Sequence, residues 1–131
     1  MLNLQITTGS ETPLFRQIVD QVRSAVVHGR LKVGDPLPSV RGLAAELVLN
    51  HNTVAKAYAQ LVREGVIESQ QGRGYFVVER RVVYTKAERR RRINALIAPL
   101  VAEAVMLGFS ADEIQVLLQK QLDKVQIKGD V

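Results

Sequence analysis

Short polar and basic side chains gather at three points between residues 39 and 74 of this 131-residue chain. The first group is Ser39 and Arg41. The second comprises His51, Asn52, Thr53 and Lys56, and the third is Gly72-Arg73-Gly74. Asparagine, threonine, lysine and arginine bind phosphates or hydrogen-bond to base edges. The residue types present therefore suit contact with a nucleic acid.

No arrangement typical of an enzyme accompanies these groups. The sequence has two histidines and no cysteine, so neither thiolate chemistry nor a zinc site is expected. Paired carboxylates and Ser/His/Asp arrangements on recognisable scaffolding are absent. Gly72-Arg73-Gly74 is too short for a phosphate-binding loop and follows no βαβ pattern. We predict that the protein is not an enzyme and uses no cofactor or metal.

Two short amphipathic segments carry the first two groups. Ser39 follows a proline and precedes a helical apolar period, so we expect it to cap a helix. Asn50 ends a three-residue turn and is expected to cap the next helix. The positions predicted to be buried are Val40, Leu43, Ala44 and Leu47 in the first helix and Val54, Ala57, Tyr58, Leu61 and Val62 in the second. This pattern is typical of a helix-turn-helix.

The third group lies in a hairpin punctuated by glycines. After Gly65, which suits the end of a helix, the hydrophobic period becomes roughly two, and we expect strands at 66–70 and 75–78. Gly72 and Gly74 flank Arg73 at the tip and permit positive φ angles there. An arginine at such a tip can reach a phosphate or a minor groove. A hairpin in this place indicates a wing.

A longer helix is expected before the helix-turn-helix. Pro13 suits the first helical position and Thr12 the N-cap, and apolar residues recur every three or four positions over 14–26. Residues 4–6 alternate between apolar and polar and predict a short strand. Residues 1–80 are therefore expected to form a winged helix-turn-helix domain that is mainly α with a small β-hairpin (α+β).

Residues 81–131 are expected to form a helical hairpin for dimerisation. Thr85 precedes a helical stretch that reaches Leu107, and Pro99 is predicted to kink or break it near 95–98. Ser110 and Glu113 have the spacing of a capping box at the start of a second helix. The polar tail from residue 124 is expected to fray.

The apolar side of this helical hairpin is too wide for its two helices to bury alone. It packs either on the winged domain or on a second copy of the chain. We favour the second copy, because paired half-sites are how such motifs reach useful affinity. The predicted homodimer interface comprises Ile93, Leu96, Ile97, Leu100, Val101, Ala104, Val105, Ile114, Leu117 and Leu118.

The four consecutive arginines at 89–92 have two interpretations. They bind phosphate that flanks a recognised site, or they form a solvated helix start that opposes the helix macrodipole, and the second is slightly favoured. The net charge of +5 and the pI near 9.9 favour an anionic partner. No apolar run approaches the roughly 18 residues needed to span a bilayer. Because the N-terminus also lacks a signal pattern, a cytoplasmic protein without a membrane partner is expected.

Several short motifs follow one another in order between residues 13 and 77. They are Pro13 to Ile18, Gly34 to Arg41, Asn52 to Val54, Ala57-Tyr58, Leu61, Glu64-Gly65 and Gly72 to Val77. Taken together, with this order and spacing, they resemble the GntR family of bacterial transcription regulators. The short C-terminal extension is similar to the YtrA-type subfamily, whose members carry a small helical dimerisation region.

This resemblance implies a dimeric repressor that binds an inverted repeat in double-stranded DNA, often at a transporter operon. It implies that Arg41 contacts phosphate or a guanine and that the wing tip enters the minor groove. Many relatives have Ser-Arg where this chain has Asn50-His51, and a basic residue is common where Ala55 stands, so base contacts are expected to shift. The predicted DNA-contacting residues are Ser39, Arg41, His51, Asn52, Thr53, Lys56, Gly72, Arg73 and Gly74.

Two other functions stay open from the residues alone. One is sequence-independent, architectural DNA binding, and the other is a winged helix that contacts proteins. Arg41 also has an alternative role as a surface ion pair to Glu46, whereas Tyr58 is expected to lie in the core because it falls on the apolar face. The sequence identifies neither an effector nor its site.

Overall fold

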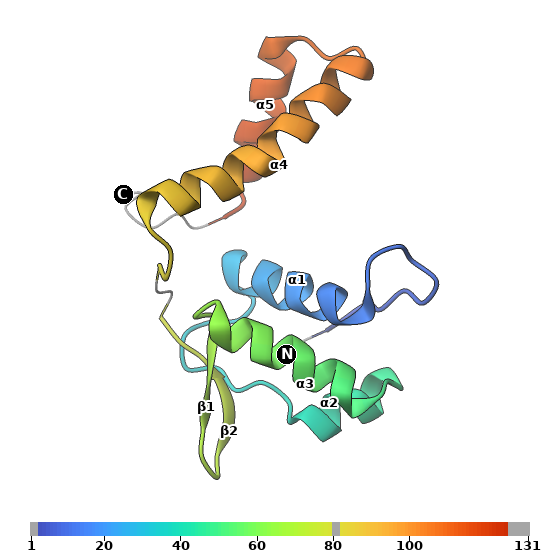
Figure 1. Ribbon diagram of the computed structural model, residues 1–131, viewed down its shortest axis with the longest axis vertical. Helices are drawn as coiled ribbons and strands as arrows, with labels where there is room; N and C mark the ends of the chain where they lie inside the picture. The colour runs from blue at the N-terminus through green and yellow to red at the C-terminus, as the bar shows by residue number, and fades with distance from the viewer. Residues whose placement is uncertain (1–2, 80–81, 126–131) are drawn as a thin grey trace. The chain divides into compact units, whose positions relative to one another are not determined.

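The computed structural model describes residues 3–79 and 82–125, and the chain divides into two compact units at residues 81 and 82 (Figure 1). The helices are α1 Leu14–Val27, α2 Val40–Leu47, α3 His51–Arg63, α4 Lys86–Met106 and α5 Ala111–Leu122, and the strands are β1 Ile67–Gln70 and β2 Gly74–Val77. The described chain is thus mainly α with one two-stranded antiparallel sheet, which confirms the predicted fold class. The predicted fraying of the tail falls mostly at 126–131, outside the described residues.

Helix α3 is the centre of the first unit, because it contacts α1, α2 and β1. Its inward face is closed off from solvent at Val54, Ala57, Tyr58 and Leu61. Around it pack residues from every other element of the unit, including Ile18, Val19, Val22, Leu43, Ile67 and Val77. Each fully buried Val, Leu or Ile side chain contributes about 1.5–3 kcal/mol, so this cluster is what holds the short helices in place.

Helices α2 and α3 each begin at a predicted cap. The Ser39 Oγ accepts from the backbone N–H of Gly42 at 2.9 Å, and the Asn50 Oδ1 accepts from that of Asn52 at 2.8 Å. Between them Val48 adopts a left-handed conformation with φ 55°. That conformation is unfavourable for a β-branched residue, and it is compensated by the hydrogen bond from the Leu49 N–H to the Ala44 carbonyl.

The wing is tied to the segment that leads into α2. Strands β1 and β2 pair antiparallel, with Ile67 opposite Val77 at the base. On the other edge of β2, the Leu37 N–H donates to the Tyr75 carbonyl and the Val77 N–H donates to the Asp35 carbonyl, both at 2.9 Å. The hairpin therefore cannot move without moving the residues that begin α2.

Tyr58 links α3 to both of these parts. Its hydroxyl donates to the Pro38 carbonyl at 2.7 Å, one residue before the Ser39 cap. Its ring meets the Tyr75 ring of the wing edge-on, with 4.8 Å between centroids. Burial raises the pKa of the Tyr58 phenol, so the hydroxyl stays protonated and remains a donor. The prediction of a core role is confirmed.

The segment before α1 is held by side chains and forms no strand. The buried amide of Gln17 accepts from the Thr7 N–H and donates to the carbonyls of Thr7 and Thr12, and Gln21 makes a similar pair of bonds with Gln5. The predicted strand at 4–6 is therefore wrong. The backbone groups of Gln5 and Thr7 bond to glutamine side chains of α1 and not to the backbone of a neighbouring strand. Thr12 is not the N-cap either, since α1 begins at Leu14 after Pro13.

The second unit consists of α4 and α5, and both helices begin at a side-chain cap, of which the one at Ser110 was predicted. The Thr85 Oγ1 accepts from the Glu88 N–H at 3.1 Å, and Ser110 and Glu113 form the reciprocal capping box. Of the predicted kink or break near Pro99, the break is wrong, because α4 continues from Lys86 to Met106. A proline removes one helical hydrogen bond, and the turns on either side hold the rest of the helix.

Replacement of Tyr58 by Phe tests the link between α3 and the start of α2. The variant keeps both rings in contact and leaves the Pro38 carbonyl without its donor, which is expected to lower the free energy of unfolding by about 1–2 kcal/mol. Urea unfolding measures the change. Tyr84→Phe is the matched control, because no hydrogen bond from its hydroxyl to a described residue is present. Equal midpoints for the two variants would contradict the role given to Tyr58.

Candidate nucleic-acid interface

The opening turn of α3 presents polar side chains to solvent. His51 and Asn52 are exposed and Thr53 is partly exposed. The Asn50 side chain satisfies the N–H of Asn52, and its carbonyl accepts from the Thr53 N–H at 3.0 Å. Because the cap fixes the backbone here, the three side chains project from a rigid turn and can meet base edges or phosphates.

The outward side of α3 carries small side chains after this turn. Asn52, Ala55 and Ala59 follow one another at helical spacing opposite the buried stripe, and Ala59 is exposed. Val62, which the sequence predicted to be buried, is 38% exposed on the same side. The helical period alone could not decide Val62, since the buried stripe is complete with Leu61. Short side chains allow a helix to approach a groove closely, and alanine can contact a thymine methyl group.

Lys56 lies at the edge of α3 beside α1. Its ammonium is 4.1 Å from the centroid of the Phe15 ring, and the Arg16 guanidinium is 5.5 Å from the same ring. A cation held over an aromatic face loses conformational freedom before it meets any partner. This contact between Phe15 of α1 and Lys56 of α3 was not predicted from the sequence.

Arg41 is exposed in the first turn of α2, directly after the Ser39 cap. Among the described residues no ion pair joins it to Glu46, so the alternative role considered for Arg41 is not seen. The Ser39 hydroxyl is already engaged as an acceptor by the Gly42 N–H. The hydroxyl proton and the second lone pair remain, so Ser39 can still donate one hydrogen bond and accept another.

The wing tip places an exposed Arg73 between two glycines. Gly72 and Gly74 have φ angles of 75° and 103°, which other residues rarely adopt. The Arg73 N–H donates to the Gln70 carbonyl at 2.9 Å and closes the turn. Figure 1 shows the hairpin projecting away from the helices of its unit. The guanidinium is thus carried at the end of an arm that starts beside α2 and α3.

The predicted dimer residues all lie in the second unit, and none of them is buried. Leu96 is 70% exposed and Leu100 is 50% exposed, and Ala104 and Ile114 are partly exposed. A contiguous apolar face of this kind is unusual for a surface in water.

Comparison with known proteins identifies the family. A sequence model described as "Bacterial regulatory proteins, gntR family" matches residues 14–77. The HTH-type transcriptional repressor YtrA of Bacillus subtilis (strain 168) is 36% identical over 111 residues, which is 85% of each chain. The chain belongs to the GntR family of bacterial regulatory proteins. It is a sequence-specific DNA-binding transcription regulator and not an enzyme.

Solved structures agree in fold with this assignment. A structure titled "Transcriptional Antiterminator" from Listeria monocytogenes EGD-e has a TM-score of 0.79 at 30% identity and covers 98% of this chain and 96% of its own. YtrA from Sulfolobus acidocaldarius, a GntR-family transcription factor, has a TM-score of 0.63 at 38% identity and covers 76% of this chain and 97% of its own. Within the described residues, no helix is both long and apolar enough to cross a membrane, and no cluster of three potential metal ligands occurs.

Two substitutions at Asn50 distinguish its role as a helix cap from its closeness to bound DNA. Asn50→Ala removes the acceptor for the Asn52 N–H and is expected to lower the free energy of unfolding by about 1 kcal/mol. Asn50→Asp keeps the acceptor and the stability, but its carboxylate repels phosphate and is expected to weaken binding to duplex DNA. Urea unfolding and fluorescence anisotropy measure the two effects. An aspartate variant that binds DNA as tightly as the unchanged protein would place Asn50 away from the interface.

Proposed function

We propose that this GntR-family protein is a dimeric, cytoplasmic repressor that binds an inverted repeat in double-stranded DNA. The observation that carries the proposal is the exposed polar turn at the start of α3, which the Asn50 cap and the Tyr58 hydrogen bond hold in place. The target genes are proposed to include a transporter operon, as the similarity to the YtrA-type subfamily implies. Two winged units of a dimer would present two such turns about one DNA turn (roughly 34 Å) apart, or a multiple of it.

Each polar group then has a role in the proposal. His51, Asn52 and Thr53 contact base edges or nearby phosphates, and Lys56 binds a phosphate from its position over Phe15. Arg41 contacts a phosphate or a guanine. Ser39 supports that contact at the start of α2, and Gly72, Arg73 and Gly74 form the part that enters the minor groove.

Selection of bound sequences from a random duplex library, with the purified protein at near-physiological salt, tests this function. We expect an enriched inverted repeat, because a two-fold dimer repeats its contacts on two half-sites. On the enriched duplex, Arg41→Ala is expected to weaken binding by about 1–3 kcal/mol if Arg41 holds a guanine. Bound DNA without an enriched motif would favour architectural binding, and no bound DNA would favour a protein-interaction module.

The dimer rests on the exposed apolar face of α4 and α5. Introduction of aspartate at both Leu100 and Val101 is expected to give monomers, because two buried charges without partners oppose an apolar interface. Light scattering reports the mass. Ala95→Asp with Ala102→Asp is the matched control, since both positions are exposed on the opposite side of α4 and the same charge is added. A persistent dimer in the Leu100/Val101 variant would move the interface elsewhere.

A further inference from the structure

Much of the positive charge of the chain is concentrated in about two turns of helix outside the winged unit. Residues 86–92, at the start of α4, hold five basic side chains and one acidic side chain, so they carry +4 of the net charge of +5. Residues 1–81, which make up the first unit, hold ten basic and seven acidic side chains, a net charge of +3. The unit that carries α3 therefore has a net charge of +3 over 81 residues, whereas the start of α4 has +4 over seven residues, and affinity for DNA depends strongly on positive charge.

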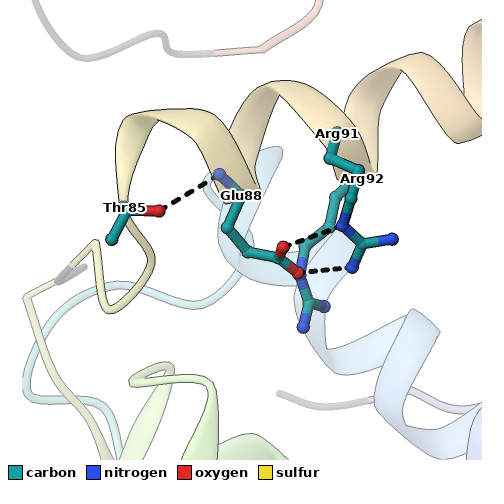
Figure 2. A network of polar contacts seen from close by, with 4 residues as sticks. All are labelled: Thr85, Glu88, Arg91 and Arg92. Atoms are coloured by element: carbon teal, nitrogen blue, oxygen red, sulfur yellow. Dashed lines mark hydrogen bonds and ion pairs between the residues drawn. The ribbon is translucent and has the colours of Figure 1, made fainter.

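One carboxylate orders two of these five cations. Arg91 makes a two-bond contact with Glu88, and the Arg92 Nε donates to the Glu88 Oε2 at 2.9 Å, as Figure 2 shows together with the Thr85 cap. The Arg92 guanidinium also lies 3.9 Å from the centroid of the Tyr84 ring. The hydrogen bonds from Arg91, and then those from Arg92, lower the pKa of Glu88 to about 2, so it is charged at any physiological pH.

The other three cations have no such partner. Lys86, Arg89 and Arg90 are exposed, and no acidic side chain among the described residues forms an ion pair with them. Lys86 is three and four residues from Arg89 and Arg90, a spacing at which like charges on a helix repel each other. All three also stand near the positive end of the helix macrodipole. Both effects disfavour the isolated helix, and both are relieved by an anion.

We propose that Lys86, Arg89 and Arg90 form a basic face that binds the DNA phosphate backbone beside the site recognised by α3 and the wing. This proposal rests on the proposed operator binding. The chain from Val77, at the end of β2, to Lys86 spans at most about 30 Å when fully extended, which is less than one turn of DNA. A chain bound through its wing therefore keeps the basic face within reach of the same duplex.

A membrane surface suits this face less well. Helices that lie on anionic lipid carry basic residues on one face and apolar residues on the other, over the same turns. Here the basic residues end at Arg92, and the apolar stripe begins at Ile93 and continues without another basic residue to the end of α4. The basic residues thus occupy the first turns of α4 and the apolar stripe occupies the later turns. The first turns can contact phosphate while the later turns make an apolar contact.

The salt dependence of DNA binding tests the basic face. Arg89→Ala with Arg90→Ala removes two phosphate contacts from each chain and is expected to make the slope of log affinity against log salt shallower by about 1.8 per chain. The selected operator and a random duplex of about four turns (roughly 40 base pairs) should lose affinity by the same factor, because phosphate contacts carry no base information. Alanine favours helix, so circular dichroism should be unchanged. Arg89→Gln with Arg90→Gln provides a second variant with the same charge.

A variant that acts in the opposite direction sharpens the test. Glu88→Gln removes the carboxylate that engages Arg91 and Arg92 and leaves the Thr85 cap, which uses the Glu88 backbone N–H. It is expected to tighten DNA binding and to steepen the salt slope. Lys120→Ala with Lys124→Ala is the matched control, because it removes two charges from the same unit at the other end of its sequence.

Each outcome has one meaning. A salt slope for the Arg89/Arg90 variant that equals that of the lysine control would overturn the basic face, while loss of affinity in Arg41→Ala would show that the proposed function still holds. Failure of the unchanged protein to bind any duplex would overturn both. Loss of binding by the Arg89/Arg90 variant to phosphatidylserine vesicles, with DNA binding unchanged, would assign the face to lipid instead.

Discussion

The hydrogen bond from the Tyr58 hydroxyl to the Pro38 carbonyl connects the three parts of the winged unit. Tyr58 belongs to the recognition helix, Pro38 precedes the cap of α2, and the Tyr75 ring against Tyr58 belongs to the wing. Residues 34–37 are themselves hydrogen-bonded to β2. One buried side chain therefore fixes α3, which is proposed to contact bases, the helix that carries Arg41 and the hairpin that carries Arg73. Burial keeps this phenol protonated, so the connection does not depend on pH in the physiological range.

A short and rigid unit of this kind can place side chains accurately while contributing few charges. Its net charge is +3 over 81 residues, and the outward side of α3 bears alanines at positions 55 and 59. Recognition by such a surface depends on close fit and on a few polar contacts, whereas attraction over longer distances depends on charge. The second unit has the complementary composition, since α4 begins with five basic side chains and continues as an apolar stripe.

Features that depend on neighbouring residues were predicted well from the sequence. The caps at Ser39, Asn50 and Ser110 all form as expected, because a cap needs only a short polar side chain and the two or three residues that follow. The wing strands were predicted to within one residue. The exposed polar turn of α3 followed from the same local rules.

Features that depend on distant residues were missed. Tyr58 and Pro38 are 20 positions apart, and Gln17 bonds to Thr7 through ten positions, so no local pattern marks either contact. The predicted strand at 4–6 was wrong for the same reason, since two glutamines from α1 take the place of a strand. The Arg89–Arg92 run shows how a structure can change an interpretation. Sequence alone treats the four arginines as equivalent, whereas the structure divides them into two that pair with Glu88 and two that have no acidic partner among the described residues. Arg89 and Arg90, which have no acidic partner among the described residues, can therefore bind an external anion, whereas Arg91 and Arg92 are held by Glu88. The regularly spaced phosphates of duplex DNA are an anion of this kind.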